Sequence, residues 1–303
     1  MRKIFGALIS AMLLSVVAPA GVLAEDTGVT SDQRVILVTG STGGLGRETA
    51  LALAQGGDHV IIHGRNEERA QQVLDAIKAD GRGSAAFYKA DLARLDETNA
   101  LADSILADYD RLDVLVSNAG VLLPDQEQRV VTDDGYEIHF QVNYLAGYVL
   151  TARLLPLLEK SAPSRVIHVA SGQRPLDFDD LMLEKEYNGL QAYFRSKNAQ
   201  IMMTFATADD LAKRGITTNA MFPSALMNTD MVTEAGFEPQ SSVETGRDAL
   251  LQLINDDVGT GKFFNIFVAD DVIPQAYDKE AQANLMRASE ELTSVPFPQS
   301  GQD

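Results

Sequence analysis

The feature that most constrains the fold of this chain is a regular alternation of short apolar runs with helix-like segments. The first run, residues 34–38, is rich in β-branched side chains and ends at Thr39-Gly40, which is typical of a buried strand. Similar runs are expected to form strands at 60–62, 85–88, 114–116, 166–169, 217–221 and 263–268. Helices are expected at about 46–56, 70–77, 96–108, 133–159, 190–213 and 245–255. This alternation predicts an α/β fold with one doubly wound parallel sheet of about seven strands and helices on both faces.

The chain is long enough for one domain with a substantial core. It has 303 residues, of which 45% are hydrophobic, and no repeat, low-complexity tract or linker interrupts residues 34–292. We therefore expect a single domain over 34–292, preceded by a polar lead-in at 25–33. The tail at 293–303, which contains Pro296, Pro298 and Gly301, is expected to be flexible.

Residues 1–24 have the pattern of a secretory signal peptide. Arg2 and Lys3 form a short basic start, residues 4–18 are apolar, and small residues precede a cleavage site after Ala24. An apolar run of about 15 residues is short for a membrane-spanning helix. The pattern predicts an exported protein, periplasmic or secreted. Two alternatives stay open: an uncleaved membrane anchor with the domain facing the cytoplasm, and a start codon assigned too early.

The charge and the cysteine content exclude several kinds of partner and chemistry. The formal net charge is −18 and the isoelectric point is about 4.5, whereas nucleic-acid binding calls for a basic surface. We therefore expect no nucleic-acid partner. The absence of cysteine excludes disulfides, thiolate zinc sites and a cysteine nucleophile. The histidines at 59, 63, 139 and 168 do not have the spacing of a ligand cluster, so no metal site is expected.

A glycine-rich turn, Thr39-Gly40-Ser41-Thr42-Gly43-Gly44-Leu45-Gly46, joins the first expected strand to the first expected helix. Glycines at this place let the backbone approach a pyrophosphate and direct the N-terminal N–H groups of the helix toward it. The turn is not a Walker loop, because Leu45 occupies the position of a required glycine. It is not G-x-G-x-x-G either, because Thr49 stands at the third glycine. A tight turn without a ligand is the alternative to a cofactor site.

The pattern T-G-x-x-x-G-x-G at 39–46 resembles the cofactor turn of the short-chain dehydrogenase/reductase family, and the resemblance extends over 34–292. It implies a Rossmann-type fold and an NAD(P)-dependent oxidoreductase that moves a hydride between nicotinamide and a carbonyl or alcohol. Further matches are Asp91-Leu92 after the third strand, Ser117-Asn118-Ala119-Gly120 after the fourth, and Thr229 after the sixth. The expected cofactor-binding residues are Thr39, Gly40, Ser41, Thr42, Gly44, Leu45, Gly46, Arg65, Asp91, Leu92, Asn118, Ala119, Gly120, Tyr193, Lys197 and Thr229.

The end of the second expected strand bears on the choice of cofactor. The sequence there is His63-Gly64-Arg65-Asn66, without the acidic residue that hydrogen-bonds the ribose 2′-OH of NAD. Arg65 has a planar, permanent charge suited to a 2′-phosphate. We therefore expect NADP, with NAD as the alternative if Arg65 is only a solvated surface residue.

Tyr193 and Lys197 form a Y-x-x-x-K pattern on an expected helix, one turn apart on the same face. A cation one turn away is expected to lower the pKa of the phenol from its ordinary value near 10. By resemblance, Tyr193 is the general acid in reduction, and Lys197 also holds the nicotinamide ribose. Ser171, after the fifth expected strand, polarises the substrate oxygen, and Asn143 anchors a water through which protons reach solvent. The resemblance thus assigns catalysis to Asn143, Ser171, Tyr193 and Lys197.

Three segments, 132–137, 177–181 and 289–292, resemble the retinol-dehydrogenase-like branch of the family and favour an apolar substrate. Pro223-Ser224 departs from the Pro-Gly of that branch, which leaves the shape of this loop open. The candidates for an apolar pocket are Phe178, Leu226, Met227, Met231 and Phe237. The alternative function is a catalytically idle nucleotide-binding sensor or scaffold on the same fold. A homo-oligomer and membrane association through the N-terminal segment are both compatible with the sequence.

Overall fold

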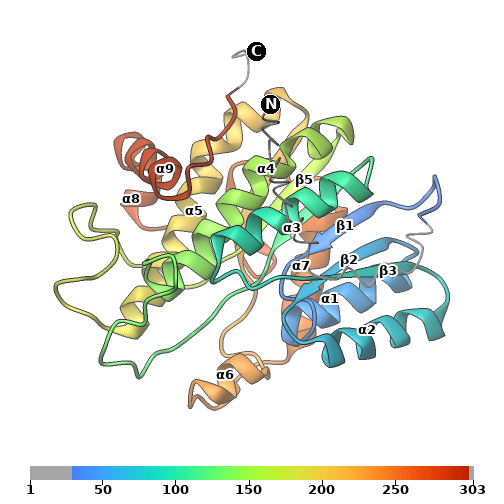
Figure 1. The fold of residues 1–303 in the computed structure, drawn as a ribbon, viewed down its shortest axis with the longest axis horizontal. Coiled ribbons are helices and arrows are strands. Elements are labelled where there is room, and N and C mark those ends of the chain that lie inside the picture. The colour runs from blue at the N-terminus through green and yellow to red at the C-terminus, as the bar shows by residue number, and fades with distance from the viewer. Residues whose placement is uncertain (1–28, 300–303) are drawn as a thin grey trace, which may run out of the picture.

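The structure of the protein, a computed structural model, describes residues 29–299, and Figure 1 draws the remaining residues as a grey trace. The expected signal peptide or anchor at 1–24 therefore lies outside the described residues. No helix within 29–299 is both long enough and apolar enough to cross a membrane.

An eight-stranded sheet, in the order β3-β2-β1-β4-β5-β6-β7-β8, lies at the centre of the domain (Figure 1). The strands are β1 (Val35–Val38), β2 (His59–Gly64), β3 (Ser84–Lys89), β4 (Val114–Ser117), β5 (Ser164–Val169), β6 (Ile216–Phe222), β7 (Lys262–Asn265) and β8 (Val268–Ala269). All neighbouring strands pair in parallel except β7 and β8. This confirms the predicted doubly wound α/β fold. The strand order reverses between β1 and β4, and such a switch point is where open α/β sheets bind ligands.

Both faces of the sheet are buried under helices. Along β1, Val35 and Leu37 pack into one hydrophobic cluster, whereas Ile36 and Val38 pack into the other. The first cluster includes side chains of α3 (Leu95–Asp108), α4 (Ala146–Lys160) and α5 (Gly189–Lys213). The second includes side chains of α1 (Gly44–Gln55), α2 (Glu67–Asp80) and α7 (Val243–Asn255). Burial on both faces explains why the strand runs are continuously apolar rather than alternating.

Two expected elements have different bounds in the structure. The helix expected at 133–159 begins later: a turn in which Gly135 has a φ of 87° precedes the π-helix η1 (Phe140–Leu145), which continues directly into α4. π-Helical turns are frequent at functional sites. The strand expected at 263–268 is interrupted where Ile266 has a φ of 57°, and β8 then folds back antiparallel to β7.

Three helices after β6 were not expected from the sequence: α6 (Asp230–Glu234), α8 (Pro274–Tyr277) and α9 (Lys279–Thr293). In α9 the buried side chains include Gln282, Ser289 and Thr293 beside Leu285. The helix is still amphipathic, since Ala281, Leu285 and Leu292 recur at helical spacing, and this periodic signal was available in the sequence.

The segment after α9 also differs from the expected flexible tail, as far as residue 299. Val295 and Phe297 are buried. The Tyr148 hydroxyl donates to the carbonyl oxygen of Val295 at 2.9 Å, and its ring lies 5.8 Å from the ring of Phe297. These contacts attach the segment to α4, so the packed domain extends beyond 292.

Candidate active site

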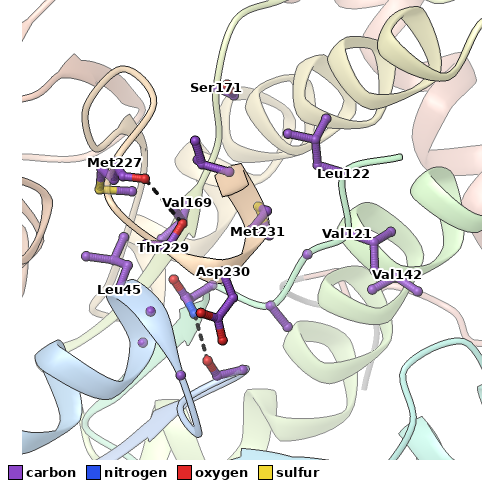
Figure 2. A pocket seen from close by; sticks show the side chains of 18 of the residues that line it. Leu45, Val121, Leu122, Val142, Val169, Ser171, Met227, Thr229, Asp230 and Met231 are labelled. Atoms are coloured by element: carbon purple, nitrogen blue, oxygen red, sulfur yellow. Dashed lines mark hydrogen bonds between the residues drawn. The ribbon is translucent and has the colours of Figure 1, made fainter. Parts of the chain in front are cut away.

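A cavity of about 720 Å³ lies at the carboxyl ends of the parallel strands. Figure 2 shows Leu45 from the glycine turn, Val121 and Leu122 from the loop after β4, and Met227, Thr229 and Met231 from the segment after β6 around it. The expected site residues that line it are Gly40, Thr42, Gly44, Leu45, Gly46, Arg65, Asp91, Leu92, Asn118, Ala119, Gly120, Ser171, Tyr193, Lys197 and Thr229. Residues far apart in the sequence are thus brought to one pocket.

The glycine turn allows a close approach of the backbone to a ligand. Gly40 has a φ of 66° and Gly44 a φ of 51°, in the left-handed region that favours glycine. A Cβ on Gly46 would lie 2.4 Å from the Gly40 carbonyl oxygen and 2.6 Å from Nδ2 of Asn118. Helix α1 begins at Gly44, and its N-cap is Gly43, which has no side chain to accept a hydrogen bond. The first N–H groups of α1 are therefore available to an anionic group.

Two expected cofactor contacts, Thr39 and Ser41, lie behind the turn rather than in the pocket. Both side chains are buried and neither lines the cavity. The Thr39 hydroxyl accepts hydrogen bonds from the backbone N–H groups of Asn118 and Ala119, both at 3.0 Å. The Ser41 hydroxyl accepts from the His63 N–H at 3.0 Å. These residues fix the turn against β2 and the loop after β4, which corrects their expected role as direct contacts.

His63 is a further support of the turn that the sequence pattern did not reveal. Its Nδ1 accepts a hydrogen bond from the Gly40 N–H at 3.1 Å, and its Nε2 lies 3.2 Å from the Ala90 carbonyl oxygen. Because an N–H can only donate, Nδ1 is unprotonated and Nε2 carries the proton. Burial lowers the pKa of His63 to about 4, consistent with this neutral form.

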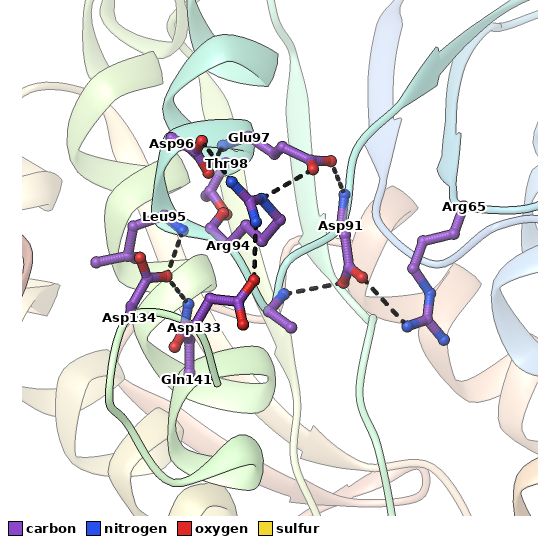
Figure 3. Close-up of polar contacts among 11 residues, drawn as sticks. Arg65, Asp91, Arg94, Leu95, Asp96, Glu97, Thr98, Asp133, Asp134 and Gln141 are labelled. Atoms are coloured by element: carbon purple, nitrogen blue, oxygen red, sulfur yellow. Dashed lines mark hydrogen bonds and ion pairs between the residues drawn. The ribbon is translucent and has the colours of Figure 1, made fainter. Parts of the chain in front are cut away.

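Two arginines line the pocket beyond the glycine turn. The Arg65 side chain is 67% exposed and lies 3.5 Å from a carboxylate oxygen of Asp91 (Figure 3), so it is free to meet an anion. Arg69, which the sequence reasoning missed, forms a 2.8 Å ion pair with Asp230 of α6. It also approaches the turn, since its Nη1 lies 3.5 Å from the position of a Cβ on Gly43. Arg69 follows Arg65 by four residues around the start of α2, and this spacing could have indicated that both arginines lie on the same side.

A polar network supports the Asp91 side of the pocket (Figure 3). The backbone N–H of Asp91 donates to Glu97 at 2.7 Å, and Arg94 bridges Glu97 at 3.1 Å and Asp133 at 2.9 Å. Asp134 accepts from the Leu95 N–H at 2.8 Å, which caps the start of α3. The loop after β3 and the turn before η1 therefore rest on the same helix end.

The catalytic residues expected on α5 and after β5 lie together. Ser171 hydrogen-bonds Tyr193, and Nζ of Lys197 lies 5.7 Å from the centre of the Tyr193 ring. The Lys197 ammonium group donates to the carbonyl oxygen of Val169 at 2.8 Å. Burial raises the pKa of Tyr193, and the Ser171 hydrogen bond opposes this rise. Burial lowers the pKa of Lys197 to about 7. The expected lowering of the tyrosine pKa by the lysine is therefore not what the structure shows.

Asn143 lies in η1, beside the pocket but not in its lining. Its Oδ1 accepts from the Val121 N–H at 2.7 Å, while its Nδ2 donates to the Val121 carbonyl oxygen at 3.1 Å and to the Ser196 hydroxyl at 2.9 Å. A Cβ on Gly120 would lie 3.1 Å from Oδ1 of Asn143 and 3.5 Å from Nζ of Lys197. The side chain thus fixes the loop after β4 next to the lysine. Its expected role in anchoring a water stays a prediction.

Part of the pocket lining is apolar. Four of the five apolar candidates line it: Leu226, Met227, Met231 and Phe237. Phe178 instead packs against the main hydrophobic core. The sequence reasoning missed the opposite wall, formed by Val121, Leu122, Ile138, Val142, Leu190 and Phe194. Within residues 29–299, no group of histidine, aspartate and glutamate side chains is arranged to hold a metal ion.

Comparison with known proteins identifies the family of this chain. Residues 34–239 match the short chain dehydrogenase family. An uncharacterized oxidoreductase of Schizosaccharomyces pombe is 40% identical over 207 residues, which cover 64% of this chain and 60% of that relative. Human retinol dehydrogenase 13 is 30% identical, with 94% of each chain covered. Human retinol dehydrogenase 12 is 31% identical, with 89% of each chain covered.

Solved structures share the fold. A short chain dehydrogenase from Shigella flexneri complexed with NADP has a TM-score of 0.64 and 31% identity, covering 77% of this chain and 96% of that one. A protein from Mycobacterium paratuberculosis has a TM-score of 0.72 and 26% identity, covering 88% of this chain and 95% of that one. These matches confirm the predicted family and the predicted similarity of this chain to retinol dehydrogenases. The chain belongs to the short chain dehydrogenase family and is an NAD(P)-binding oxidoreductase.

Proposed function

We propose that the protein is an NADP-dependent carbonyl reductase or alcohol dehydrogenase for an apolar substrate. The observation that carries this proposal is a single pocket in which Ser171, Tyr193 and Lys197 lie between a glycine cradle and an apolar wall. A nucleotide-binding sensor without catalysis would have no need for these three side chains in one pocket.

The residues around the glycine turn fit a nicotinamide dinucleotide phosphate. The N–H groups at the start of α1 suit its pyrophosphate, and the exposed guanidinium groups of Arg65 and Arg69 suit its 2′-phosphate. When bound, the cofactor supplies the hydride. Relatives complexed with NADP and NADPH support the choice of NADP over NAD.

The remaining chemistry belongs to the protein's own side chains. A phenol with an ordinary pKa near 10 is protonated at neutral pH, and burial raises the pKa of Tyr193 further, so its hydroxyl can donate a proton to a substrate oxygen. The Ser171 hydroxyl, which hydrogen-bonds Tyr193, can polarise the same oxygen. Nζ of Lys197 lies 5.7 Å from the centre of the Tyr193 ring and donates to the Val169 carbonyl oxygen, so the amino group is held in place beside the tyrosine.

The apolar wall defines the substrate class. Leu122, Val142 and Leu190 face the pocket from one side, and Met231 and Phe237 belong to the segment after β6 on the other. Such a lining favours an aldehyde, ketone or alcohol with a hydrocarbon body. Relatives named retinol dehydrogenases support a long apolar substrate, with retinoids as one class to test.

A turnover screen tests this function. Purified protein is incubated with aldehydes, ketones and alcohols of increasing apolar length, including retinal and retinol, with NADPH, NADP⁺, NADH and NAD⁺ in turn. Nicotinamide absorbance reports turnover. We expect turnover of apolar compounds, faster with the phosphorylated cofactors. If the protein binds the cofactor but turns over none of the compounds, the proposal of an enzyme is refuted and a nucleotide-binding sensor is favoured.

We also propose that residues 1–24 direct export, from the basic start, apolar run and small residues before the cleavage site. Expressing cells are fractionated and the N-terminus of the mature protein is sequenced. A first residue of Glu25 in the exported fraction is expected, whereas an intact Met1 on a soluble cytoplasmic protein would overturn the proposal.

A further inference from the structure

A buried acid–histidine pair lies next to the catalytic tyrosine. The side chains of Glu137 and His139 are 1% and 0% exposed, and Nδ1 of His139 lies 2.7 Å from Oε1 of Glu137. Both residues directly precede η1. Neither residue lines the cavity.

The hydrogen bonds fix the proton positions of this pair. The backbone N–H of Leu123 donates to Nε2 of His139 at 3.0 Å, so Nε2 is unprotonated and Nδ1 donates to Glu137. Oε2 of Glu137 also accepts from the Phe140 N–H at 2.8 Å, and Oε1 accepts from the Tyr187 hydroxyl at 3.1 Å. The carboxylate thus accepts hydrogen bonds from three donors. The imidazole that it orients accepts in turn from the Leu123 N–H and so fixes the position of Leu123.

The pair joins three segments that converge on the active site. Leu123 follows Val121 and Leu122, which form part of the pocket wall, and Tyr187 lies two residues before the start of α5, which carries Tyr193. The start of α5 also packs tightly on the same loop, since a Cβ on Gly189 would lie 2.0 Å from the Leu123 carbonyl oxygen. A displacement of Leu123 would therefore be transmitted to both the wall and the helix.

His139 also contacts the tyrosine directly. Its ring lies edge-on to the ring of Tyr193, with 6.3 Å between the centres and an angle of 80°. Both imidazole nitrogens are already engaged, by Glu137 and by the Leu123 N–H. The orientation of the imidazole is thus fixed, and it presents a fixed surface to the phenol ring.

We propose that Glu137 and His139 are positioning residues that hold Tyr193 and the Leu122–Leu123 loop in the geometry needed for proton transfer to the substrate oxygen. A buried carboxylate costs stability that an apolar side chain would not, whereas its directional hydrogen bonds define one arrangement of the segments around it. This inference rests on the proposed function, in which Tyr193 is the proton donor.

The variant Glu137→Gln tests the pair, because it keeps the size of the side chain and the imidazole but removes the charge and one acceptor. With a substrate from the screen, we expect kcat to fall about 10- to 100-fold, as for a misplaced catalytic group. The dissociation constant for NADPH should stay within about twofold, since the cradle is untouched. The solvent deuterium isotope effect on kcat should rise, because proton transfer from Tyr193 becomes slower. The matched control is Glu159→Gln on α4, which makes the same substitution at a partly exposed carboxylate away from the cavity and should change kcat less than about threefold.

A second readout needs no turnover. In protein labelled with ¹³C at the tyrosine Cζ, the Tyr193 signal is assigned by its loss in Tyr193→Phe. We expect Glu137→Gln to move this signal and leave that of Tyr88 unchanged, and His139→Gln serves in its place if Glu137→Gln does not fold. An unchanged isotope effect and an unchanged Tyr193 signal would overturn the inference. Absence of turnover by the wild-type protein would instead refute the proposed function, and the Tyr193 signal would still decide the positioning.

Discussion

Acidification is predicted to destabilise this protein through three buried histidines. Burial lowers the pKa of each of His59, His63 and His168 from an ordinary 6.5 to about 4. The folded state therefore prefers the neutral imidazoles, and the unfolded chain binds protons first as the pH falls. Their contribution to stability is complete above pH 6.5 and is lost as the pH falls from there toward 4.

The size of the effect follows from the two pKa values. Between pH 7 and pH 5, protonation of each histidine is expected to lower the free energy of unfolding of the protein by roughly 2 kcal/mol, and the three together by about 6 kcal/mol. A domain has about 5–15 kcal/mol in total, so most of the stability is expected to disappear in this interval. Urea unfolding followed by circular dichroism at pH 7 and pH 5 measures the difference.

His168 is the best position at which to test this reasoning, because neither of its ring nitrogens has a hydrogen-bond partner among the described residues. His168→Leu should change the free energy of unfolding at pH 7 by less than about 1 kcal/mol and remove about one third of the loss between pH 7 and pH 5. The matched control is Thr218→Val on β6, which removes a buried hydroxyl that also has no partner within the described part of the chain. It should leave the pH dependence unchanged. A wild-type protein equally stable at both pH values, or a His168→Leu variant with the full loss, would refute the reasoning.

Three further substitutions test the active site. Tyr193→Phe should lower kcat about 100-fold or more and leave NADPH affinity unchanged, since only the proton donor is removed; near-normal turnover in a steady-state assay would contradict its role. Arg65→Ala should weaken NADPH binding about tenfold and leave NADH binding unchanged in a fluorescence titration, whereas the exposed Arg82→Ala should alter neither. Gly46→Ala should destabilise the fold by about 2 kcal/mol in urea, because its Cβ would lie 2.4 Å from the Gly40 carbonyl oxygen; in Gly43→Ala the nearest atom is 3.5 Å away, and equal stability of the two variants would disprove the steric argument.

The sequence predicts the fold, and it selects catalytic candidates that the structure brings to one pocket, because both leave local signals. Buried parallel strands leave continuous apolar runs, and Tyr193 and Lys197 are related by one helical turn. Two of the elements it missed, α6 and α8, have five and four residues and are too short for a helical period to show. Helix α9 mixes polar side chains such as Gln282 and Ser289 with the apolar ones on its buried face, and Val295 and Phe297 are packed by long-range contacts with Tyr148.

Side-chain direction within the glycine turn was also beyond the sequence. A turn has no constant periodicity, so nothing local distinguishes Thr39 and Ser41, which face the protein, from Thr42, which faces the pocket. Likewise, the Arg69–Asp230 pair joins residues 161 positions apart, and only the packing of α6 beside α2 brings them together.

The ionisation of the catalytic pair is set by burial rather than by spacing, and this bears on the direction of the reaction. Four-residue spacing suggested a lysine that lowers the tyrosine pKa, but enclosure of the pocket disfavours both charged forms. It raises the pKa of Tyr193 and lowers that of Lys197 to about 7. A phenol that holds its proton at neutral pH is ready to donate it, whereas oxidation would first require the phenolate. We therefore expect oxidation of an alcohol, which uses the phenolate as a base, to become faster as the pH rises, and pH profiles of kcat in both directions measure this.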